Sequence, residues 1–171
     1  MNRTILAVIL CAIVQLGILA NTALPVVPNL LLLISIWVLL HGQPKHALWV
    51  ALASGILLDA YASSAFGTYL MTFIIVILLL QWLVTSVLPK EENLMFVVIV
   101  VAAASTATLI LSTLIDFGLA YATGKDTYIA SAFFRLESLY SIFLNVVIYY
   151  PASYIFRKII GLTDEEKSLR V

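Results

Sequence analysis

Charged side chains are scarce in this 171-residue sequence: Lys, Arg, Asp and Glu make up 11% of it, whereas about 25% is usual in soluble domains. Nine Lys and Arg balance nine Asp and Glu, so the chain lacks the basic excess that is typical of nucleic-acid-binding proteins. Its single cysteine, Cys11, excludes an internal disulfide and any site built from several thiolates. The composition therefore argues against a nucleic-acid binder and a secreted disulfide scaffold.

Apolar side chains, in contrast, are abundant. Hydrophobic residues make up 63% of the sequence, against about 45–50% in soluble proteins. A soluble core of this size cannot bury so many apolar side chains, so the excess is expected to face lipid. We therefore predict an all-α, polytopic membrane protein and exclude a cytosolic enzyme or a disordered chain.

Long uncharged stretches divide the chain into six predicted transmembrane helices, since about 20 apolar residues cross a bilayer. They form one transmembrane domain over residues 1–171, with short loops and a charged tail over residues 157–171. Spans 2 and 3 are short enough that a re-entrant hairpin is the alternative to two full crossings. The predicted spans are Thr4–Thr22, Pro28–Leu40, Ala47–Tyr61, Gly67–Leu88, Leu94–Leu119 and Phe133–Phe156.

The distribution of basic residues predicts the orientation, because cytoplasmic loops carry the excess of Lys and Arg. With both termini cytoplasmic, seven basic residues lie inside, and the outside holds Lys125, with Arg135 slightly within span 6. The inner seven are Arg3, Lys45, Lys90, Arg157, Lys158, Lys167 and Arg170. We expect a multi-pass membrane protein with both termini in the cytoplasm.

Three ionisable residues fall within the predicted spans, all near their outer ends: Asp59, Asp116 and Arg135. Such residues usually face the bundle interior and pair with each other. An arginine–carboxylate pair would lower their desolvation cost. The alternatives are an outward-opening binding pocket, a structural ion pair that sets the helix register, and residues that reach the lipid headgroups.

Stripes of small and polar residues run along three of the spans. Span 3 has Ala47, Ala51 and Gly55 one turn apart, followed by Asp59. Small residues let helices approach closely, and hydroxyl or amide groups form hydrogen bonds between helices. We interpret the stripes as helix-packing surfaces, with a ligand cavity as the alternative. The stripes of spans 5 and 6 are Ser105, Thr108 and Ser112, and Ser138, Ser141 and Asn145.

Signatures of catalysis and of cofactor binding are weak. His41 and His46 flank a turn that contains no Asp or Glu to complete a metal site, so we interpret them as solvated loop residues. The sequence has no nucleophile elbow, zinc-protease motif or phosphate-binding glycine loop. We predict no enzyme activity, no metal and no cofactor.

One segment, residues 28–76, is more specific. It opens with Pro28 and Asn29 before a leucine run, turns, and continues in a helix that ends Gly-Ile-Leu-Leu-Asp at Asp59, with Gly67 shortly after. This pattern resembles the bacterial rod-shape-determining membrane protein MreD. Asn29 stands where that family often has Asp, which keeps a helix N-cap but removes a charge.

The resemblance implies a non-catalytic scaffold of the cell-wall elongation complex. It implies a partner of the MreC type, a single-span periplasmic coiled-coil protein, and indirect association with actin-like MreB and with the wall-elongation transpeptidase and glycosyltransferase. On this interpretation Gly55, Asp59 and Gly67 shape the outer end that contacts the partner.

The alternative function is the substrate-binding S-component of an energy-coupling vitamin transporter, a six-span bundle that the MreD fold is thought to resemble. Its pocket would open outward, where Asp59, Asp116, Arg135 and Asn145 are predicted to converge. Bulky residues along span 1, including Ile5 and Ile9, weakly disfavour it, because S-components use small-residue stripes there.

Overall fold

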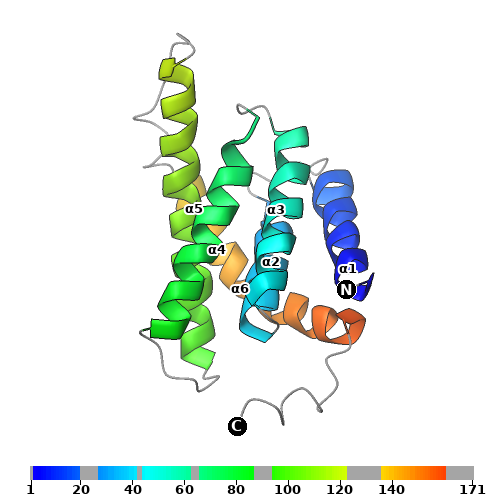
Figure 1. The fold of residues 1–171 in the computed structure, drawn as a ribbon. Coiled ribbons are helices and arrows are strands. Elements are labelled where there is room, and N and C mark those ends of the chain that lie inside the picture. The colour runs from blue at the N-terminus through cyan, green and yellow to red at the C-terminus, as the bar shows by residue number, and fades with distance from the viewer. Residues whose placement is uncertain are drawn as a thin grey trace.

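The computed structural model describes residues 2–19, 27–41, 44–62, 66–86, 94–122 and 136–160, and within these ranges the chain is all-helical. Each predicted span overlaps one α-helix, and the helices pack side by side as a bundle (Figure 1). The elements are α1 (Asn2–Ala12), η1 (Ile13–Ile18), α2 (Leu30–His41), α3 (Pro44–Tyr61), α4 (Thr68–Ser86), α5 (Leu94–Ala122) and α6 (Leu136–Ile160).

The helices differ in the length and hydropathy that mark a candidate membrane span. Three stretches are long and apolar enough to cross a membrane: Thr68–Ser86, Met95–Gly118 and Leu139–Ile160. Arg3–Ile18 and Leu30–His41 are apolar but shorter. The first of these differs from the predicted continuous α-helix, because η1 continues α1 as a π-helical segment. Such segments are rare and are often found at functional positions.

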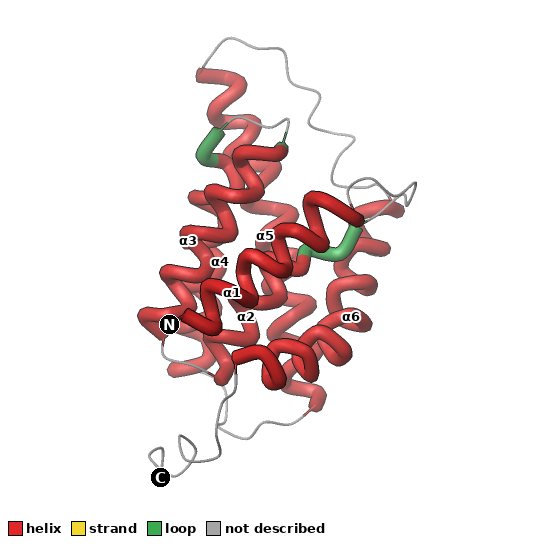
Figure 2. Tube along the Cα trace, turned by 90° about the vertical axis from the view of Figure 1, so that its right-hand side faces the viewer, coloured by secondary structure: helices red, strands yellow, loops and turns green. Residues whose placement is uncertain are grey.

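Helix α2 is the centre of the bundle. All residues from 31 to 39 are buried, which fits a helix that is apolar on every side. It contacts each of the other five α-helices. Figure 2, viewed from the side of α1, shows α1 in front of α2, with α3 on one side and α6 on the other. The short α2 is therefore enclosed by protein along its length.

Charged side chains separate toward the two ends of the bundle. Among the described side chains the basic ones are Arg3, Lys45, Arg157 and Lys158, at the end where α1 and α3 begin and α6 finishes (Figure 1). The described carboxylates lie toward the opposite end: Asp59 is in the last turn of α3, and Asp116 is within the last two turns of α5. This polarity matches the charge bias from which the orientation is predicted.

Candidate functional site

The carboxylate of Asp59 lies against the beginning of the next helix, α4. Its Oδ1 accepts a hydrogen bond from the N–H of Tyr69 at 2.8 Å. Its Oδ2 accepts from the N–H groups of Gly67 and Leu70, each at 3.0 Å. The first N–H groups of a helix have no partner within it, and the helix dipole favours a negative charge there. We call this arrangement, Asp59 with the three N–H groups, the α4 cap.

Two glycines allow the α4 cap to form. Gly67 has a φ of 101°, a left-handed conformation that other residues rarely adopt. Gly55 faces the start of α4 so closely that an added Cβ would lie 2.6 Å from Cα of Leu70. A side chain there would push α4 away from Asp59. The structure thus brings together Gly55, Asp59 and Gly67, and Asp59 is 5% exposed.

A second set of polar side chains surrounds the beginning of α2. Oε1 of Gln15, on η1, accepts a hydrogen bond from the N–H of Leu31 at 3.0 Å. Oδ1 of Asn29 accepts from the N–H of Leu32 at 3.0 Å, which confirms the N-cap expected for Asn29. Oδ1 of Asn145, on α6, accepts from the N–H of Asn29 itself at 2.8 Å. We call Gln15, Asn29 and Asn145 with these N–H groups the α2 cap.

The α2 cap extends to α5. Nδ2 of Asn145 donates to Oγ of Ser105 at 3.1 Å, so the amide group of Asn145 is bonded through both its oxygen and its nitrogen. Nε2 of Gln15 lies 3.5 Å from Oδ1 of Asn29, a longer and weaker contact. Gln15, Ser105 and Asn145 are each less than 10% exposed. Side chains from η1, α5 and α6 therefore meet at the first turn of α2.

Both caps satisfy backbone groups that a membrane environment does not solvate. An N–H group left unpaired in an apolar medium costs several kcal/mol, so helix ends inside a bundle need internal partners. Patterns in the sequence do not predict the bonds that Gln15 and Asp59 make to backbone groups. The available signal for Gln15 is that it is the one amide side chain among residues 4–20, which are otherwise almost entirely apolar.

The predicted outward convergence of Asn145 with the aspartates is not what the structure shows. Asn145 bonds Ser105, which precedes Asp116 by eleven residues on α5, or about 16 Å of helix rise. Asp116 is half-buried and interacts electrostatically with Tyr69, near the α4 cap. Arg135, the proposed partner of the aspartates, lies outside the described residues, as does the side chain of Ser138.

The remaining stripe residues take different positions. Ala47 and Ala51 are fully buried. Thr108 and Ser112 donate to carbonyl groups of their own helix, those of Ala104 and Leu109, in place of a neighbouring helix. Within the stripe on α5, Ser105 thus differs in that its hydroxyl group accepts a hydrogen bond from another helix, from Asn145 on α6. Ser141 is half-buried on α6.

The histidines do not lie in a recognisable metal site. No group of three His, Cys, Asp or Glu side chains with metal-binding geometry occurs among the described residues. His41 stacks on Trp37, with ring centroids 4.8 Å apart, and His46 is exposed at the beginning of α3. The buried amide and carboxylate side chains of the two caps bond N–H groups at the beginnings of helices.

The helical bundle, its apolar surface and its internally capped helices define a small integral membrane protein. A family model described as rod shape-determining protein MreD matches residues 2–159. The chain belongs to the MreD family, whose members determine rod shape in bacteria and are structural membrane proteins not known as enzymes. No curated protein and no solved structure matches the chain.

Proposed function

We propose that this protein is a non-catalytic scaffold of the bacterial cell-wall elongation complex. It crosses the inner membrane six times, keeps both termini in the cytoplasm and binds an MreC-type single-span partner. Through that partner it associates with actin-like MreB and with the transpeptidase and glycosyltransferase of wall elongation. The proposal rests on membership of the MreD family and on the two caps, in which buried polar side chains bond the beginnings of helices.

The observation that supports a contact surface is the α4 cap. Three hydrogen bonds hold Asp59 to the start of α4, so both oxygens of its carboxylate already accept from backbone N–H groups. Beside it, Tyr61 ends α3 and Phe66 precedes Gly67, and these aromatic side chains are 70% and 71% exposed. Large aromatic residues on a rigid support are favoured anchors in protein interfaces. We assign the partner contact to Tyr61 and Phe66.

The test is purification of the tagged protein from its native cells in a gentle detergent, with mass spectrometry of the proteins that accompany it. We expect a single-span periplasmic coiled-coil protein and wall-elongation enzymes. The double variant Tyr61→Ser/Phe66→Ser should lower recovery of the coiled-coil protein at least tenfold. Its thermal unfolding should stay close to that of the wild type, because neither side chain is part of the core.

Trp82→Ser is the matched control, because it removes an aromatic side chain, 62% exposed, at the other end of α4. It should leave partner recovery unchanged. Equal recovery from Tyr61→Ser/Phe66→Ser and the wild type would refute the assigned surface. Recovery of ATPases with a membrane coupling subunit, or of a tightly bound small molecule, would replace the scaffold by the S-component function.

A further inference from the structure

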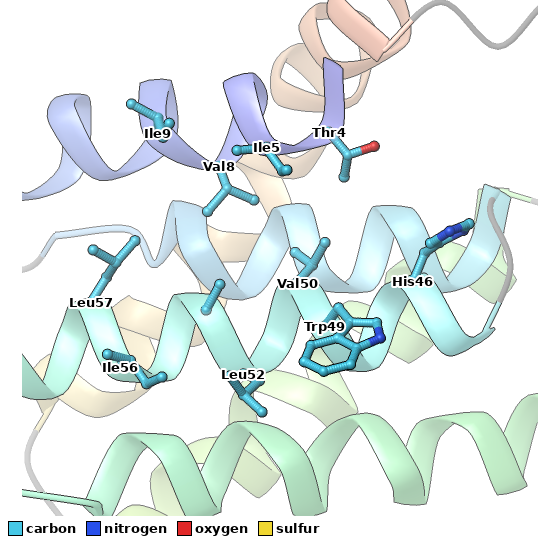
Figure 3. A pocket seen from close by; sticks show the side chains of 11 residues that line it. Thr4, Ile5, Val8, Ile9, His46, Trp49, Val50, Leu52, Ile56 and Leu57 are labelled. Carbon is cyan, nitrogen blue, oxygen red and sulfur yellow. The ribbon is translucent and has the colours of Figure 1, made fainter. Parts of the chain in front are cut away.

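A groove between α1 and α3 is independent of both caps. Its volume is about 570 Å³, within the range of about 300–1,000 Å³ that is usual for small-molecule sites. Its walls are aliphatic along most of its length, from Ile5 and Ile9 on α1 to Ile56 on α3 (Figure 3). Apart from the indole of Trp49, its polar lining groups are Thr4 and His46, and Figure 3 shows both at the same end.

The groove opens onto the outer surface of the bundle. Exposed fractions of the lining side chains are 52% for Ile5, 48% for Ile9 and 69% for Trp49. In a membrane protein such a surface faces hydrocarbon, where a concave apolar site is filled by another apolar chain. The shape of the groove and the charges at its end indicate what kind of molecule fills it.

Positive charge is concentrated beside the polar end of the groove. Arg3 and Lys45 adjoin Thr4 and His46 in sequence, and both are exposed. The first turns of α1 and α3 lie at this end, so their N–H groups and dipoles also favour an anion. The described carboxylates belong to the opposite end of the bundle. The groove therefore complements a molecule with an anionic head and an apolar tail.

The lining and the charges favour a lipid tail over a partner helix. The groove follows α3 from His46 to Leu57, about 16 Å of helix rise, and is apolar along most of this length. An apolar partner helix would leave the cations at its end, Arg3 and Lys45, without a counter-charge, whereas an anionic lipid matches both the apolar walls and the charged end. A lipid acyl chain is narrow enough to enter.

We propose that this groove binds an anionic phospholipid, with an acyl chain between α1 and α3 and the phosphate beside Arg3, Lys45 and His46. Basic sites between transmembrane helices are known to hold anionic lipid headgroups. The bound lipid would hold α1 against α3. The inference does not depend on the partner contact proposed for Tyr61 and Phe66, which lie at the other end of the bundle.

The test uses the delipidated full-length protein in detergent, with phosphatidylglycerol or phosphatidylcholine of the same acyl chains added at equal concentration. Native mass spectrometry measures the lipid that stays bound. We expect phosphatidylglycerol to be retained at least fivefold better. Arg3→Gln/Lys45→Gln should remove this preference, since each basic residue near a lipid surface contributes about fivefold in affinity.

Two further variants separate the groove from a general attraction to charge. Arg157→Gln/Lys158→Gln removes two exposed cations at the same end of the bundle, on α6, and should leave the preference unchanged. Ala53→Phe places a ring in the groove and should reduce retention of both lipids, with circular dichroism and thermal unfolding to verify the fold.

Three outcomes would overturn the inference. One is equal retention of the two lipids by the wild type. Another is an equal effect of the α6 variant and Arg3→Gln/Lys45→Gln, which would assign the preference to general surface charge. The third is a dimer that Ala53→Phe dissociates, which would assign the groove to a second copy of the chain.

Discussion

The N–H groups in the first turns of α2 and α4 have no acceptor within their own helix, and different side chains bond them at the two helices. At α4 one residue, Asp59, bonds N–H groups that lie 8 to 11 residues further along the chain. At α2 the acceptors include Gln15, 16 residues from its partner, and Asn145, 116 residues away. The α4 cap needs only one helical hairpin, whereas the α2 cap needs η1, α2, α5 and α6 together.

The two caps also differ in charge. The α4 cap uses a carboxylate and adjoins the exposed side chains of Tyr61 and Phe66. The α2 cap uses neutral amides at the centre of the bundle, where a charge would cost more to bury. Asp59 is itself only 5% exposed, but the α4 cap lies toward one end of the bundle, whereas the α2 cap is enclosed by four helices. A carboxylate serves in the first cap and neutral amides, which both donate and accept, serve in the second.

The largest expected effect comes from removing the carboxylate of the α4 cap. Asp59→Ala leaves three N–H groups unpaired and should lower the free energy of unfolding by about 3–5 kcal/mol, less than the sum of three separate bonds to a charged group. Asp59→Asn retains one acceptor oxygen and should lose about half as much. Unfolding in mixed detergent–SDS micelles, followed by circular dichroism, measures both; equal stability of Asp59→Ala and wild type would refute the cap.

The next effect comes from placing a carboxylate in the α2 cap. Asn145→Asp keeps an acceptor for the N–H of Asn29 but introduces an acid among helices, and should cost about 2.5–3.5 kcal/mol. Asn145→Ala, measured by the same unfolding titration, should cost about 1–3 kcal/mol. If Asn145→Asp proves more stable than Asn145→Ala, the distinction between a carboxylate cap toward the end of the bundle and a neutral amide cap at its centre is wrong.

A smaller effect is expected from the close approach that allows the α4 cap. Gly55→Ala places a Cβ 2.6 Å from Cα of Leu70, and should lower stability by about 1–3 kcal/mol as α4 shifts away. Hydrogen exchange at the N–H groups of Tyr69 and Leu70 should increase with it. Gly17→Ala, where an added Cβ meets nothing within 4 Å, is the matched control and should change neither measurement.

The smallest effect is expected at the edge of the α2 cap. Ser105→Ala removes the oxygen that accepts from Asn145, and should cost about 0.6 kcal/mol, the average for hydrogen bonds between membrane helices. Thr108→Ser keeps the bond of a hydroxyl to its own helix and is the comparison one turn away. A loss above about 2 kcal/mol at Ser105 would mean that it supports more of the cap than one bond.

Much of the local structure follows from patterns in the sequence. Long uncharged stretches predict the helical segments, because only a helix satisfies its own backbone within an apolar run. Asn29 before a leucine run predicts an N-cap, which its bond to Leu32 confirms. The π-helical segment at Ile13–Ile18 was not predicted, since apolar composition does not distinguish it from an α-helix.

The composition of the helices and the charge difference between the two ends can be predicted from the sequence, because hydropathy and helix capping act over a few neighbouring residues. The bonds of Asp59 to the backbone of α4, and of Asn145 to Asn29 and Ser105, depend on how the helices pack and are known from the fold. Helical spacing places a polar residue on one side of a helix but does not say which neighbour faces it. The N–H groups that these side chains bind occur at nearly every residue, so they leave no pattern in the sequence.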